Sequence, residues 1–209
     1  PAGIQSAVFA AANIVIQSAI NSLGTVVMAA FAAAVKIDSF AYMPVQDFGN
    51  AFSTYVAQNY GAGKQERIRK GIKSAFVTSV IFCAIISLLV IVFAKPLMCI
   101  FINPKETEII LAGVIYLCIE GACYIGIGVL FLLYGYYRAV NKPFMSVVLT
   151  VISLGTRVLL AYILSAIPAI GVIGIWVSVP IGWALADITG IVYYFMKSKK
   201  QLEMIKNNE

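Results

Sequence analysis

The stretch SAFVTSVIFCAIISLLVIVFA, from Ser74 to Ala94, decides the fold class of this chain. It holds no Asp, Glu, Lys or Arg, and an α-helix needs about 20 mostly apolar residues to cross a bilayer. The whole chain of 209 residues is 61% hydrophobic and 11% charged, whereas soluble domains are about 45–50% apolar and about 25% charged. These values exclude a water-soluble globule and a disordered chain, and they indicate an integral membrane protein.

Five further apolar stretches predict an all-α, polytopic protein with six transmembrane helices. We expect spans at about 4–20, 26–60, 74–94, 109–137, 144–164 and 173–195, because only helices of this length or closed barrels satisfy the backbone in lipid. Together they predict one six-helix lobe over residues 1–197, followed by a basic tail over 198–209. The chain starts with an apolar run and no basic leader, so we expect a piece of a longer polytopic protein rather than a signal peptide.

The basic residues predict the orientation of these spans. Eleven of the 15 Lys and Arg residues fall between spans two and three, between spans four and five, or after span six. The opposite loops carry only Lys95 and Lys105. Since Lys and Arg accumulate in cytoplasmic loops, we expect a multi-pass protein of the plasma or inner cell membrane with both ends of this chain cytoplasmic. The net charge of +6 is then a topological signal, and we expect no nucleic-acid partner.

The composition also argues against an enzyme. The His count is 0, which removes His-based zinc sites and Ser-His-Asp catalysis. The four cysteines form no CxxC pair and are expected to be reduced packing residues. The stretch Gly61–Lys64 lacks the spacing of a phosphate-binding loop. We therefore expect no catalytic residue, no metal site and no cofactor.

Span two carries a polar stripe. At 100° per residue, Asp47, Asn50 and Thr54 fall within about 40° of Lys36 on a helical wheel. A membrane helix with such a stripe faces protein or water along it, because lipid penalises polar side chains. Asp38 lies two residues from Lys36 and therefore points to nearly the opposite face.

Charges inside the spans suggest an ion-handling site. We place Lys36 near the midplane and Glu120 of span four at a similar depth. The functional hypothesis is that Lys36, Asp38, Asp47 and Glu120 line a polar cavity and handle ions or protons. The alternative is a buried Lys–Glu or Lys–Asp pair that only holds helices together. We assign no site to Arg157 of span five, which could pair or extend toward the interface.

Tyr116 and Tyr124 lie one helical turn before and after Glu120. A carboxylate among aromatic rings suits a cationic amphipathic ligand through charge pairing and cation–π contact, so both tyrosines are candidate substrate-binding residues. An aromatic packing stripe with one satisfied acid is the alternative.

Span six has a small residue at every fourth position, which predicts close approach of another helix. The series comprises Gly174, Ser178, Gly182, Ala186 and Gly190.

Three stretches resemble MATE transporters. YMPVQDFGNAFSTYVAQNYGAGKQERIRKG, from Tyr42 to Gly71, resembles the second helix and following loop of the family's C-terminal half, with Pro44 expected to kink the helix. PAGIQSAVFAAANIVIQSAINSLG, from Pro1 to Gly24, is similar to the family's seventh helix. YYRAVNKP, from Tyr136 to Pro143, is similar to its Arg-containing motif.

The resemblance implies the C-terminal lobe of a twelve-helix secondary antiporter. Such proteins export cationic or amphipathic drugs and metabolites in exchange for sodium ions or protons by alternating access. The implied partners are the N-terminal six-helix lobe, membrane lipid and a small-molecule substrate. In some members the seventh helix carries a glutamate, but residues 1–24 here contain no acid.

Two alternatives stay open beside the antiporter. A lipid-linked saccharide flippase of the same superfamily would need several cationic residues around its cavity, and only Lys36 and Arg157 lie inside spans. A non-transporting membrane scaffold would confine its polar residues to helix–helix contacts, which the long stripe of span two does not favour.

Overall fold

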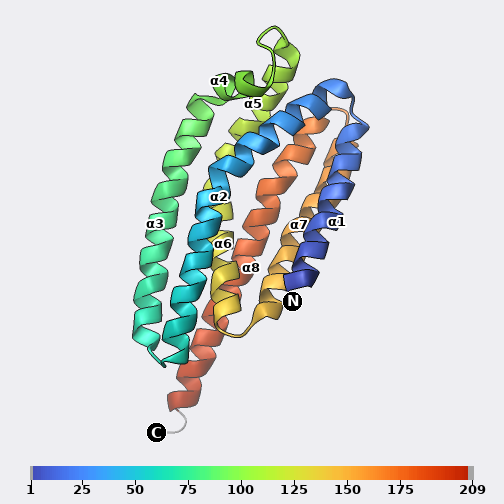
Figure 1. Cartoon of the computed structure of the whole chain (residues 1–209). Helices are drawn as coiled ribbons and strands as arrows, with labels where there is room; N and C mark the ends of the chain where they lie inside the picture. Colours follow the sequence, from blue (N-terminus) through green and yellow to red (C-terminus); the bar gives the residue numbers. More distant parts are fainter. Residues whose placement is uncertain (1, 207–209) are drawn as a thin grey trace.

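A computed structural model describes residues 2–206, and the side-chain surroundings of residues 3–196. Within this range the ordered elements are helices (Figure 1): α1 (Ala2–Asn21), α2 (Thr25–Gly61), α3 (Gln65–Val92), α4 (Ala94–Phe101), α5 (Thr107–Gly121), α6 (Tyr124–Ala139), α7 (Pro143–Ser165) and α8 (Val172–Lys206). Five of them are long and apolar enough to cross a membrane, and the bent pair α5–α6 is a sixth candidate span when its two helices are counted together. The prediction of an all-α, six-span membrane protein is confirmed.

Short turns join the long helices. Gly63, between α2 and α3, has a φ of 69°, and Asn141, between α6 and α7, has a φ of 56°. Both lie in the left-handed region, which glycine and asparagine tolerate best. The helix α3 begins at Gln65, well before the expected residue 74, and its first turns contain an exposed ion pair of 2.8 Å between Lys70 and Glu66. The basic segment is therefore a helical extension of span three.

Two helix pairs approach closely through small residues. A Cβ atom on Gly135 of α6 would lie 2.5 Å from the carbonyl oxygen of Gly49 in α2. On α8, a Cβ atom on Gly182 would collide with the backbone of Ser153 in α7. All five small residues predicted to form a seam on span six are buried, so the structure confirms that this face of α8 is a packing face.

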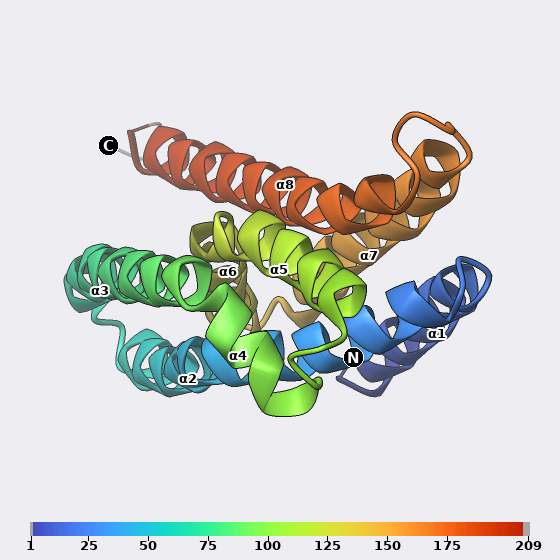
Figure 2. The ribbon, with the colours of Figure 1, turned by 90° about the horizontal axis from the view of Figure 1, so that it is seen from above.

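Two features of the bundle differ from the predictions. The expected continuous span over 109–137 is broken between Gly121 and Tyr124, and α5 and α6 meet there at 52°. The short helix α4 was not predicted, and Figure 2 shows it across the end of the bundle beside α5. Its Met98 is fully buried and packs against Gly113 of α5.

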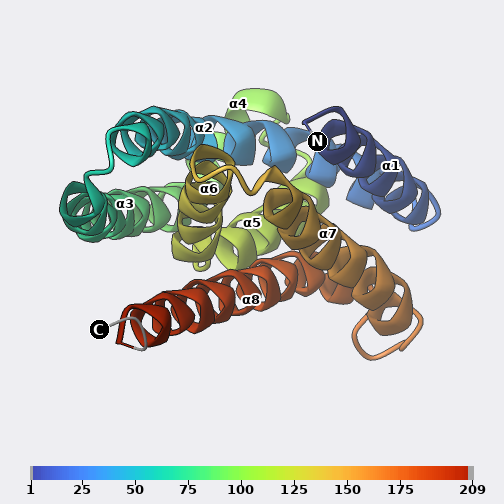
Figure 3. The same cartoon turned by 90° about the horizontal axis from the view of Figure 1, so that it is seen from below.

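The long helices lie side by side with particular neighbours. Seen from below, α1 lies beside α7, and α2 lies beside α6 and α3 (Figure 3). The N-terminal part of α2 runs obliquely to the rest of that helix, which contains Pro44 (Figure 1). A proline removes one backbone hydrogen bond and allows such a change of direction.

Candidate functional site

A cluster of polar side chains from α2, α5, α6 and α7 lies inside the lobe. It consists of Asp38, Tyr116, Glu120, Tyr124 and Arg157, which we call the charged cluster. The side chain of Asp38 is 6% exposed and that of Glu120 is 0% exposed. Carboxyl groups at such burial are costly unless they are paired or protonated, so this cluster is the first candidate for function.

Asp38 is held by a tyrosine from another helix. The hydroxyl of Tyr124 donates a hydrogen bond of 2.6 Å to Oδ1 of Asp38. Hydrogen bonds to ionised groups are short and stronger than neutral ones. As predicted, Asp38 points away from the exposed polar stripe of α2 and into the lobe.

Glu120 lies at the break between α5 and α6. Both of its carboxylate oxygens are buried and have no hydrogen-bond partner. The break frees backbone groups, and the hydroxyl of Ser87 in α3 donates a hydrogen bond of 2.5 Å to the carbonyl oxygen of Gly121. Broken helices with an acid at the break are typical of ion and substrate sites in transporters, because irregular backbone in a membrane needs a polar surrounding.

Arg157 is the cation of the cluster, a role that the sequence analysis missed. It acts electrostatically on both Asp38 and Glu120. It nevertheless makes no ion pair within 4.0 Å, since the one such pair among the described residues joins Lys70 to Glu66. Its Nε atom is buried without an acceptor. The guanidinium therefore neutralises part of the acidic charge from a distance.

Tyr116 packs on the aromatic side of the cluster. Its ring makes edge-to-face contacts with Phe31 of α2 at 5.7 Å and with Trp176 of α8 at 5.8 Å between centroids. Tyr116 and Tyr124 are 3% and 2% exposed. Both rings are thus inside the lobe, where they surround the acids rather than an open surface.

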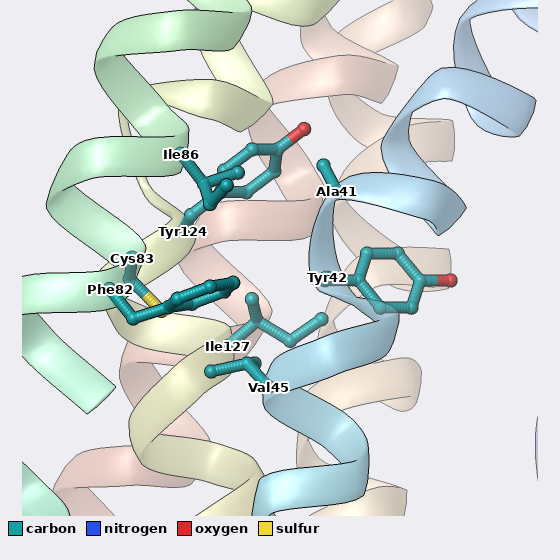
Figure 4. Close-up of a pocket in the computed structure, with 8 residues that line it drawn as sticks. All are labelled: Ala41, Tyr42, Val45, Phe82, Cys83, Ile86, Tyr124 and Ile127. Atoms are coloured by element: carbon teal, nitrogen blue, oxygen red, sulfur yellow. The ribbon is translucent and has the colours of Figure 1, made fainter. Parts of the chain in front are cut away.

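Tyr124 also forms part of a small apolar pocket between α2, α3 and α6. Figure 4 shows its ring on the wall of this pocket, together with the side chains of Ala41, Tyr42, Val45, Phe82, Cys83, Ile86 and Ile127. The hydroxyl of Tyr124 thus meets Asp38, whereas its ring borders apolar side chains. Apolar packing shields the hydrogen bond on this side of Tyr124.

Lys36 does not join the acids, so the structure forms neither the expected polar cavity that Lys36 would share with them nor the alternative Lys–Glu or Lys–Asp pair. It is exposed, and its Nζ lies 5.8 Å from the centroid of the Phe101 ring in α4. Lys36 lies two residues from the buried Asp38, so helical periodicity directs it to nearly the opposite face of α2, away from the acids.

The rest of the polar stripe lies on the surface of the lobe. Asp47, Asn50 and Thr54 are all exposed. Asn50 accepts a hydrogen bond of 2.9 Å from Nη2 of Arg138 in α6, and Thr54 donates one of 3.3 Å to the carbonyl oxygen of Asn50. The structure therefore separates the predicted site residues into a buried group around Asp38 and Glu120 and an exposed face on α2.

Comparison with known proteins identifies the family. The MatE family model matches residues 1–163. The chain belongs to the MatE family. It is 24% identical over 204 residues to the probable multidrug resistance protein YoeA of Bacillus subtilis, covering 97% of this chain and 44% of that protein. It is 30% identical over 153 residues to the probable multidrug resistance protein YpnP of the same organism, covering 73% of this chain and 34% of that protein.

Solved structures show the same fold. A MATE transporter in complex with MaL6 has a TM-score of 0.88 at 17% identity, covering 96% of this chain and 45% of that one. A MOP superfamily transporter from Pyrococcus furiosus has a TM-score of 0.85 at 19% identity, covering 92% of this chain and 43% of that one. The chain thus spans less than half the length of these relatives. The resemblance to MATE transporters is confirmed, and the family consists of membrane transporters rather than enzymes.

Within this MatE chain, the sequence had placed Asp38 and Glu120, the two acids of the charged cluster, inside spans, but it revealed neither their cation nor the helix break. Arg157 was visible as a charge inside a span, which was the available signal. Its partners lie on α2 and α5, 119 and 37 residues away, and only packing brings them together.

Proposed function

We propose that this chain is the C-terminal lobe of a MATE-type antiporter in the plasma or inner cell membrane, with both of its ends cytoplasmic. The lobe comprises residues 1–197, and a basic cytoplasmic tail over 198–209 follows it. With an N-terminal six-helix lobe it exports cationic or amphipathic compounds in exchange for sodium ions or protons. The MatE match and the multidrug resistance names of the relatives support this proposal.

The observation that carries the coupling role is the burial of Asp38 and Glu120 at the α5–α6 break without a counter-ion in contact. Two ionised carboxyl groups carry more negative charge than one nearby guanidinium can neutralise, and this excess favours uptake of a proton or a small cation. We assign ion coupling to these two acids, with Tyr116 and Tyr124 as their neighbours.

The exposed stripe of α2 has a different role in the proposal. Lys36, Asp47, Asn50 and Thr54 form a polar face that is unfavourable against lipid, so it faces the other lobe and the substrate path. The sequence predicted one cavity lined by Lys36, Asp38, Asp47 and Glu120. The proposal instead divides these residues between the exposed face of α2 and the buried charged cluster.

A second substrate class has one specific observation in its favour. The chain is 24% identical over 201 residues to a protein named FAD transporter in Shewanella oneidensis, covering 95% of this chain and 43% of that protein. An anionic flavin nucleotide is therefore the alternative substrate. A flippase for a lipid pyrophosphate is less favoured, because Lys36 lies on the surface and Arg157 lies among acids.

The test is energised efflux from drug-sensitive cells that express this chain together with its N-terminal lobe. The probes are ethidium and FAD, and the variants are Glu120→Gln and Asp38→Asn at equal protein levels. The matched control is Glu66→Gln, whose side chain is 81% exposed in the Lys70 ion pair. Loss of efflux in the two buried variants, but not in Glu66→Gln, supports the proposal, and unchanged efflux in all three contradicts the coupling role.

A further inference from the structure

The charged cluster contains more acidic groups than basic groups. Two carboxyl groups, Asp38 and Glu120, face one guanidinium, that of Arg157. The remaining titratable groups that act on them or respond to them are Tyr116 of α5, Tyr124 of α6 and Cys123 at the break. The α8 residue beside them is Trp176, which carries no charge. Among the described residues, the ionised cluster is therefore one positive charge short of neutrality.

Arg157 is placed to act on the acids without occupying their oxygens. It lies beyond 4.0 Å from both carboxylates, and both oxygens of Glu120 are buried without a donor. A guanidinium in contact would form a bidentate pair and close the site. The separation leaves the oxygens of Glu120 open to one further positive charge.

We propose that Arg157 is a tethered counter-cation that limits the charged cluster to one exchangeable positive charge, a proton or a monovalent cation. This inference rests on the proposed coupling role of the two acids and specifies its stoichiometry. Arg157 is a positioning residue here, because it acts through the carboxyl groups. Without its charge, both acids compete to remain ionised in one low-dielectric site, and each then requires a proton or a cation.

Trp176 provides a direct readout. Its ring contacts Tyr116, which neighbours Glu120, and the chain contains 2 tryptophans. Replacement of Trp183 by Phe leaves Trp176 as the sole reporter in the purified 209-residue chain. Fluorescence is titrated with protons, and separately with NaCl against choline chloride at constant ionic strength. Glu120→Gln shows whether the signal originates in the cluster.

The decisive comparison is between Arg157→Gln and Arg157→Lys. We expect a single-charge titration in the parent and in Arg157→Lys. In Arg157→Gln we expect two charges to bind in successive steps, so that the titration is broader, and its first midpoint is shifted about tenfold toward lower proton or sodium concentration. Melting temperatures of the three proteins identify any variant that fails to fold, in which case Arg157→Met replaces Arg157→Gln.

Identical titrations in the parent and in Arg157→Gln, including no response in either, overturn the inference. The result is independent of transport, because it measures binding in the chain itself. A transporter that loses efflux on mutation of the acids but titrates identically without Arg157 keeps the proposed function and rejects the counter-cation. The expected titrations in a protein without efflux keep the counter-cation and reject the transport proposal.

Discussion

The hydroxyl of Tyr124 donates a 2.6 Å hydrogen bond to Oδ1 of Asp38, and this bond joins α6 to α2 across 86 residues. It fixes one buried acid next to the helix break that carries the other, Glu120. The bond thus contributes to the contact between α2 and α6 and also holds an acid to which we assign ion coupling.

Removal of this hydrogen bond should destabilise the lobe. Tyr124→Phe leaves a buried carboxyl group without its donor, and we expect a loss of about 1.5–3 kcal/mol in the free energy of unfolding. Thermal unfolding of the purified chain in detergent, followed by circular dichroism, measures the effect. The control is Tyr162→Phe in α7, whose side chain is 49% exposed. Equal melting temperatures for the two variants would contradict this prediction.

The close approach of α2 and α6 should tolerate no added methyl group. In Gly135→Ala the new Cβ lies 2.5 Å from the carbonyl oxygen of Gly49, so one helix must shift. We expect destabilisation by about 1–3 kcal/mol, as for overpacked cores. Gly155→Ala is the matched control, since a Cβ there has no neighbour within 4 Å. The prediction is wrong if both variants unfold at the same temperature.

Ser87 should stabilise the break between α5 and α6. Ser87→Ala leaves the carbonyl oxygen of Gly121 without its side-chain donor, which should cost about 1–3 kcal/mol locally. Hydrogen exchange followed by mass spectrometry should show faster exchange around residues 120–126 and little change in α7. Ser74→Ala, at an exposed position of the same helix, is the control. Unchanged exchange at the break in Ser87→Ala would argue that packing alone holds it.

The exposed stripe of α2 should be in contact with water, whereas the exposed face of α3 should be in contact with lipid. In a cysteine-free chain assembled with its N-terminal lobe, we expect Thr54→Cys to react with a hydrophilic thiol reagent at least about tenfold faster than Ile85→Cys, because thiolates form in water. Ile85 is 54% exposed, and Val56→Cys at 0% exposure is the buried control. Equal rates at positions 54 and 85 would place the stripe in lipid.

The fold class could be read from the sequence because membrane insertion depends on local properties. Hydropathy and length alone predict Ser74–Ala94 and its counterparts as spans, and rotation by 100° per residue separates Asp38 from Lys36. The small-residue series of α8 predicts a close helix contact by the same local logic.

The break after Glu120 was not predictable in this way. Gly121, Ala122 and Cys123 are small or apolar, so hydropathy continues across them. The interruption is visible only in the backbone hydrogen bonds and in the contact of Ser87 with Gly121.

Local sequence properties were enough to predict a membrane protein of six helices and to place four acids, Asp38, Asp47, Glu120 and Asp187, within its spans. Which charges meet depends on the packing of the helices. Lys36 is close to Asp38 in sequence but lies on the opposite face of α2, beside Phe101. Arg157 is far from both acids in sequence, yet it becomes their counter-charge. Helical periodicity fixes the direction of a side chain on its own helix, whereas the packing of helices against one another fixes its partners.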